Sequence, residues 1–94
     1  MSGPETTDRT LEAFRTRITE LDREIVAAVN RRIELVRELH RYKGEQGIPV
    51  RDLERERRLV ELLAEANEGP LSREGLERLV EFVLELVREE NARG

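Results

Sequence analysis

The pattern of apolar and polar positions predicts one long amphipathic helix at the start of the chain. Between Leu11 and Lys43, apolar residues recur at alternating steps of three and four, and no proline or glycine intervenes before Gly44. A pattern kept up over roughly four to five heptads is typical of a helix that packs against other helices, and this helix would be roughly 50 Å long. The residues of this apolar stripe are Leu11, Phe14, Ile18, Leu21, Ile25, Ala28, Leu35, Leu39 and Tyr42, with Arg32 interrupting them.

The second half of the sequence predicts two shorter helices. The segment GEQGIP, residues 44–49, contains two glycines and a proline and marks the end of the long helix. A second helix is expected to begin near Val50 to Asp52 and to end at about Ala66. A third is expected to run from a cap at Ser72 to about Asn91. Strands have little support, so the predicted fold class is all-α, with one long helix and two shorter ones.

The first residues predict a tail. Residues 1–8 are small and polar and include a glycine and a proline. We therefore expect a flexible N-terminal tail over residues 1–8, a helix cap at Thr7 or Asp8, and a single domain over residues 9–94.

Composition and length together predict a homodimer. The chain has 94 residues, of which 40% are charged, 37% hydrophobic and 3% aromatic, a profile typical of amphipathic helices. The core of so short a monomer would be marginal, and the two shorter helices cannot cover the whole stripe of the long one. A helical bundle of two copies would cover it.

The same composition excludes several classes of function. There is no cysteine, which excludes disulfides, thiolate metal sites and cysteine nucleophiles. The single histidine, His40, cannot form a metal cluster and is expected on a helix surface. The net charge is -4 and the basic residues are interleaved with acids, which argues against nucleic-acid binding. No apolar run has the length of a signal sequence or a membrane span, so we expect a cytoplasmic protein without a membrane interaction.

Five charged residues fall on positions that should face the core. They are Arg32, Lys43, Asp52, Arg55 and Glu56. A buried salt bridge explains Arg32, taken alone, as well as an anionic ligand does. An acidic first turn, with Arg55 paired to a neighbouring acid, explains Asp52, Arg55 and Glu56. Taken together, cations outnumber acids on these positions, which suits a small dianion that carries a hydroxyl group.

The sequence resembles the all-helical (type II) class of chorismate mutase. The resemblance extends from about Leu11 to Asn91 and is carried by three motifs. The first comprises Arg15, Ile18, Leu21 and Asp22; the second Arg31, Arg32, Glu34 and Lys43; the third, which is the most specific, Pro49, Val50, Asp52, Arg55 and Glu56. The resemblance implies an intertwined dimer that rearranges chorismate to prephenate in the biosynthesis of Phe and Tyr.

The resemblance also implies roles for individual residues. Arg15, Arg32 and Arg55 would bind the two carboxylates of chorismate. Lys43 would donate to the ether oxygen, and Glu56, with Asp52 nearby, would accept from the ring hydroxyl. The reaction is a pericyclic shift that needs no cofactor or metal, so the protein supplies geometry and electric field.

Two positions depart from the family pattern. Many members have Ser or Thr where this chain has Val87, and Gln or Glu where it has Asn91. Val87 cannot form a hydrogen bond, and Asn91 keeps the amide on a side chain one methylene shorter. We expect both to line the substrate site, with Asn91 beside the ether oxygen. We also expect an enzyme of lower activity, or one whose site becomes tighter when a partner protein binds.

The spacing of the arginines predicts a site shared between two chains. Arg15 precedes Arg32 by seventeen positions, which corresponds to about 25 Å along one helix. Both cannot contact one small ligand from the same chain, so Arg15 is expected to come from the partner chain. The resemblance leaves open a docking interaction with the first enzyme of the shikimate pathway, which some family members make.

Two other functions compete with the mutase. Isochorismate pyruvate lyase shares the fold and an active-site lysine, but the motif around Asp52, Arg55 and Glu56 favours the mutase. A non-catalytic helical module that regulates another enzyme would explain the apolar stripe. It would have no need, however, for three arginines and a lysine on buried faces, namely Arg15, Arg32, Arg55 and Lys43.

Overall fold

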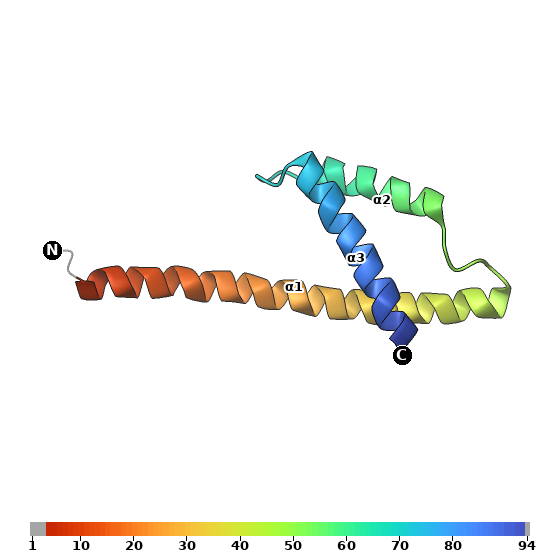
Figure 1. Ribbon diagram of the computed structural model, residues 1–94, viewed down its shortest axis with the longest axis horizontal. Helices are drawn as coiled ribbons and strands as arrows, with labels where there is room; N and C mark the ends of the chain where they lie inside the picture. The colour runs from red at the N-terminus through yellow and green to blue at the C-terminus, as the bar shows by residue number, and fades with distance from the viewer. Residues whose placement is uncertain (1–3, 94) are drawn as a thin grey trace. The chain divides into compact units, whose positions relative to one another are not determined.

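The computed structural model describes residues 4–93, which form three α-helices (Figure 1). Helix α1 comprises Pro4–Gln46, α2 comprises Leu53–Ala66 and α3 comprises Arg73–Arg93. Residues 4–93 contain no strand, so the predicted all-α fold class is confirmed. The chain divides into an N-terminal part that ends at Arg31 and a C-terminal part that begins at Arg32, and the two are described separately.

The start of α1 differs from the prediction. The helix already includes Pro4 to Asp8, so the expected cap at Thr7 or Asp8 is wrong and most of the predicted tail is helical. Proline is compatible with the first turn because the first amides of a helix have no helical partner, and the acidic Glu5 interacts favourably with the positive end of the helix dipole. Residues 1–3 of the predicted tail lie outside the described residues.

The end of α1 is set by glycine, one turn later than predicted. Gly44 is still helical, and the helix ends at Gln46 because Gly47 adopts the left-handed conformation, with φ of 69°. The Ile48 amide then donates to the Lys43 carbonyl at 2.8 Å, and the Gly47 amide donates to the Gly44 carbonyl at 3.4 Å. This pair of bonds is a Schellman motif, which directs the chain out of α1 and satisfies two of its last carbonyls.

The two shorter helices begin at side-chain caps. The Asp52 carboxylate accepts a hydrogen bond from the Arg55 amide at 3.0 Å at the start of α2. The Ser72 hydroxyl accepts one from the Gly75 amide at 3.0 Å at the start of α3, as predicted. Each cap satisfies one of the first amides of its helix, and so fixes where the helix begins.

The core of the C-terminal part lies where α2 and α3 pack against each other. Leu76, Val80 and Val87 of α3 are its buried hydrophobic residues among those described. At the surface, the Arg73 guanidinium donates to Glu61 of α2 and to Glu77 of α3, and these hydrogen bonds raise the pKa of Arg73. Leu79, three positions after Leu76 on α3, is exposed.

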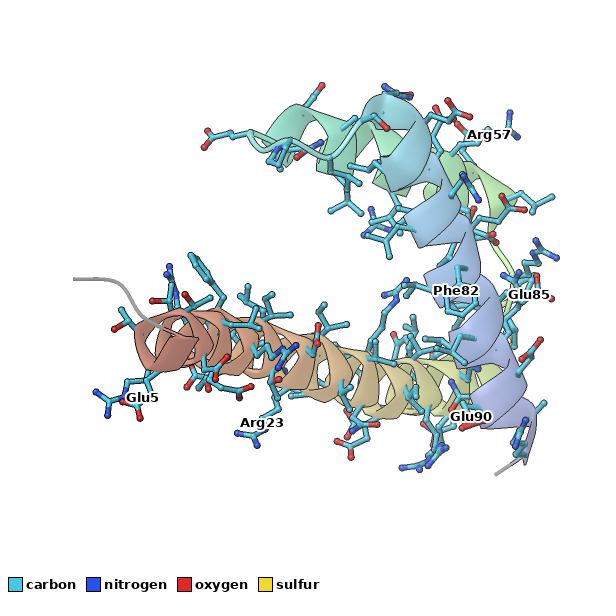
Figure 2. All side chains as sticks on the ribbon, turned by 60° about the vertical axis from the view of Figure 1, so that its left-hand side comes forward. Glu5, Arg23, Arg57, Phe82, Glu85 and Glu90 are labelled. Carbon is cyan, nitrogen blue, oxygen red and sulfur yellow. The ribbon has the colours of Figure 1, made fainter. Side chains whose placement is uncertain are left out.

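The apolar stripe of α1 is exposed in the N-terminal part. Leu11, Phe14, Ile18, Leu21 and Ile25 have exposed fractions between 44% and 60%. Charged side chains of both signs occupy the same helix, as the red and blue stick ends along α1 show (Figure 2). Among the described residues, no helix combines the length and the apolar character needed to cross a membrane.

Candidate active site

A cavity of about 140 Å³ lies within the C-terminal part. Its walls come from the C-terminal turns of α1, the segment between α1 and α2, the first turn of α2 and the second half of α3. The lining residues are Arg32, Val36, His40, Lys43, Val50, Arg51, Asp52, Arg55, Glu56, Leu84, Val87 and Arg88. Figure 1 shows why helices distant in sequence contribute: α3 runs back from the end of α2 toward α1, and its C-terminal end reaches α1 through a hydrogen bond between Asn91 and Arg37.

The cavity contains most of the residues that the sequence pointed to. The five charged residues on predicted core-facing positions, from Arg32 to Glu56, all line it, and so does Val87. Arg32, Val36, His40 and Lys43 occupy one face of α1 because they are spaced by three and four positions. The Asp52 cap and the first turn that follows it bring Arg55 and Glu56 to the same cavity.

Two guanidinium groups in the cavity have no acidic partner within the described chain. Over residues 4–93, the side chains of Arg32 and Arg55 form no ion pair and no hydrogen bond. The alternative explanation of Arg32 as half of an internal salt bridge therefore finds no support in one chain. Arg32 is half-buried, and a half-buried cation without a partner is unfavourable unless an anion comes from outside.

The other charged groups of the cavity already have contacts within the protein. The Lys43 ammonium donates to the Val50 carbonyl at 3.0 Å. One oxygen of Asp52 serves as the cap of α2. Glu56 accepts from Arg51 at 3.1 and 3.5 Å and lies 3.5 Å from Arg88, and 23% of its side chain is exposed. In all, five cationic side chains and two carboxylates line the cavity, so it is locally positive in a chain with a net charge of -4.

Two predicted site residues have contacts outside this cavity lining. Arg15 belongs to the N-terminal part, where its guanidinium pairs with Glu12 at 2.7 Å. Asn91 lies on α3 one turn after Val87, and its side-chain oxygen accepts a hydrogen bond from Arg37 at 3.0 Å. The amide nitrogen of Asn91 is buried and has no hydrogen-bond partner among the described residues.

Comparisons with known proteins assign this arrangement to a family. Residues 14–92 match the family described as chorismate mutase type II. The chain belongs to the chorismate mutase type II family. The predicted family and its activity, the isomerisation of chorismate to prephenate in aromatic amino-acid biosynthesis, are thereby confirmed.

Two solved structures have the same fold. A chorismate mutase (form I) from Thermus thermophilus is 28% identical, with a TM-score of 0.80, and the match covers 83% of this chain and 98% of that one. A second structure of chorismate mutase (form II) from the same organism is 27% identical, with a TM-score of 0.82, and the match covers 89% of this chain and 96% of that one. No curated protein sequence matches the chain.

Within this chorismate mutase fold, several residues of the cavity were not predicted from the sequence. Arg51 and Arg88 both contact Glu56, and His40, expected on the helix surface, is half-buried in the lining. The apolar pattern could not identify Arg88, because it lies next to Val87 in the sequence rather than on the buried face formed by Leu76, Val80 and Val87. His40 was identifiable, since it lies three positions before Lys43 and eight after Arg32, which is one helix face. No group of residues suited to hold a metal occurs in the described chain.

Proposed function

We propose that the cavity between α1, α2 and α3 binds chorismate and catalyses its rearrangement to prephenate, with Arg32 and Arg55 receiving the substrate carboxylates. The supporting observation is the pair of unpartnered guanidinium groups in one positively charged cavity of the described chain. A guanidinium binds a carboxylate through two parallel hydrogen bonds, so each group can hold one end of the ligand in a defined orientation. The flexible enolpyruvyl arm would thereby be held over the ring, which supplies proximity without any chemical step by the protein.

Lys43 is proposed to stabilise the transition state. An ammonium group has three donors, and the Val50 carbonyl takes one of them. The remaining donors can oppose the negative charge that develops on the ether oxygen as the C–O bond breaks. Because this charge is larger in the transition state than in the bound substrate, Lys43 should contribute more to turnover than to binding.

The two carboxylates are proposed to recognise the ring hydroxyl. Glu56 lies in the cavity as a hydrogen-bond acceptor and is held in place by Arg51 and Arg88. Asp52, which lines the same cavity, has one oxygen in the α2 cap and a second oxygen that can accept from a ligand. An acceptor at this position would distinguish chorismate from a dianion of the same shape that lacks the hydroxyl.

Arg15 is proposed to complete the site from the partner chain of a homodimer. The exposed stripe from Leu11 to Ile25 is an apolar surface of the kind that a second copy would cover. The spacing of seventeen positions between Arg15 and Arg32, about 25 Å in a helix, prevents both from reaching one ligand within a chain. The Arg15–Glu12 ion pair is exposed, with 62% and 66% of the two side chains accessible, so it can be exchanged for a substrate carboxylate at little cost.

Two further predictions concern the surroundings of the enzyme. A cytoplasmic location is proposed, which is consistent with membership of the chorismate mutase type II family. Docking to the first enzyme of the shikimate pathway is also proposed. It would make the site tighter and so compensate for Val87, which cannot form a hydrogen bond with the substrate.

The direct test is the loss of chorismate absorbance with the purified protein alone. We expect prephenate as the product, and no pyruvate or salicylate when isochorismate is supplied instead. The double variant Arg32→Ala/Arg55→Ala, which removes both unpartnered cations, should abolish turnover while the protein still melts cooperatively. Pyruvate release from isochorismate without conversion of chorismate would replace this proposal with the lyase function.

A further inference from the structure

The carboxylate of Glu56 lies between two guanidinium groups that come from different parts of the fold. Arg51, in the segment before α2, donates through Nε to Oε2 at 3.1 Å and through Nη2 to Oε1 at 3.5 Å. Arg88, on α3, places Nη1 at 3.5 Å from Oε1. Oε1 therefore faces both arginines, whereas Oε2 faces only Arg51.

This arrangement leaves one side of the carboxylate available to a ligand. A carboxylate oxygen can accept two hydrogen bonds, so Oε2 retains acceptor capacity while Oε1 is occupied from both sides. All three residues line the cavity, and Glu56 is the least exposed of them, with 23% of its side chain accessible against 57% for Arg51 and 41% for Arg88. The two arginines thus cover the carboxylate and fix which of its oxygens is presented.

Arg88 differs from the unpartnered cations of the cavity. Within residues 4–93, Arg32 and Arg55 have no acidic partner, and their guanidinium groups are free for the substrate carboxylates. The guanidinium of Arg88 is engaged with Glu56, and it is the contact that connects this carboxylate to α3. Without Arg88, Glu56 would be held only by Arg51, which lies outside the helices.

We infer that Arg88 is a positioning residue, which fixes the Glu56 carboxylate so that its Oε2 side accepts the ring hydroxyl of the substrate. This inference rests on the proposed function, because it assigns a task to a residue of the same site. A long glutamate side chain has several rotamers, and only some of them present the carboxylate to the ligand. Arg88 raises the population of the productive rotamer, and small misplacements of such groups carry large penalties in rate.

A double-mutant cycle between Arg88 and Glu56 tests the inference. We expect Arg88→Met to lower kcat/KM for chorismate by about tenfold, since the methionine keeps the apolar stem and removes the guanidinium. In the Glu56→Gln background the same substitution should change kcat/KM by less than about twofold, because the carboxylate on which Arg88 acts is gone. A tenfold loss that persists in the Glu56→Gln background would overturn the inference, since Arg88 would then act on the substrate directly.

Binding of a chorismate analogue without the ring hydroxyl provides a second readout. Its dissociation constant should be the same for the wild-type protein and for Arg88→Met, whereas chorismate should bind more weakly to the variant. Equal weakening of both ligands would also overturn the inference. Arg88→Lys should regain only part of the lost activity, because an ammonium cannot reproduce the planar fork.

Arg93→Met serves as the matched control. Arg93 is on the same helix and pairs with Glu90 at 3.0 Å, but 77% of its side chain is exposed and it does not line the cavity. It should have wild-type kinetics. A wild-type protein that does not convert chorismate would contradict the proposed function itself, whereas an active wild-type protein with an unchanged Arg88→Met variant would contradict only this inference.

Discussion

At the scale of single residues, the Lys43 ammonium is both anchored by the protein and available to a ligand. Its bond to the Val50 carbonyl at 3.0 Å fixes its position at the end of α1. We predict that Lys43→Ala lowers kcat by about 100-fold, the scale seen for donors that stabilise a developing oxyanion, and raises KM by a much smaller factor. Steady-state kinetics would measure both constants. Arg41→Ala, an exposed cation on the same helix, is the control and should leave kcat unchanged.

Asn91 offers a second donor whose orientation is imposed by its neighbour. Arginine can only donate, so the side-chain oxygen of Asn91 must face Arg37 and its nitrogen must point away. A buried nitrogen without a partner is unfavourable by about 1–3 kcal/mol, and a substrate oxygen would relieve this.

We therefore predict that Asn91→Asp, which keeps the acceptor for Arg37 but removes the donor, lowers kcat about tenfold without lowering the melting temperature. The new ion pair with Arg37 compensates for the lost amide. Chorismate turnover and thermal unfolding, measured on the same preparation, provide the two readouts. Unchanged kcat would mean that this nitrogen has no part in the reaction.

At the scale of the helices, the caps determine which side chains reach the cavity. Asp52 ends the segment after α1 and starts α2, and Arg55 and Glu56 follow in the first turn. The residue therefore caps α2 and also lines the cavity, where we propose that its charge serves the site. These two contributions can be separated by substitution, because asparagine caps a helix as well as aspartate does.

We predict that Asp52→Ala destabilises the protein by about 1 kcal/mol, the usual cost of a lost N-cap, and that Asp52→Asn leaves the melting temperature nearly unchanged. If the second oxygen of Asp52 contributes charge at the ring hydroxyl, both variants lose activity. Thermal unfolding followed by circular dichroism measures the stability. Ser72→Ala is the matched control, since it removes the α3 cap at a helix end remote from the cavity lining and should lower stability without lowering kcat.

The helices show what could and could not be predicted from the sequence. Their number, their order and the cap at Ser72 followed from periodicity and local chemistry, which act over a few residues. The start of α1 at Pro4 was not predicted. Proline and small polar residues were interpreted as a tail, although they are equally compatible with the first turn of a helix. Arg88 could not be predicted as part of the site, since its contact with Glu56 depends on how α3 packs against α2.

At the scale of the whole molecule, the exposed apolar stripe and the position of Arg15 lead to the same expectation. Leu11 to Ile25 present an uncovered stripe, and the cavity residues all lie between Arg32 and Arg88. A homodimer would cover the stripe and bring Arg15 of one protomer to the cavity of its partner. Each site would then need an intact Arg15 on one chain and an intact Lys43 on the other.

This requirement predicts complementation between two inactive variants. Arg15→Ala and Lys43→Ala proteins, each nearly inactive, would be unfolded together and refolded at equal concentration. Random pairing makes about half of the dimers mixed, and each mixed dimer has one intact site, so roughly a quarter of the wild-type sites should return, assuming independent sites in a two-fold dimer. Arg32→Ala mixed with Lys43→Ala is the control that should regain nothing, because both residues serve the same site of the same chain. Mixed Arg15→Ala and Lys43→Ala dimers that are confirmed by mass but remain inactive would mean that Arg15 does not serve the neighbouring site.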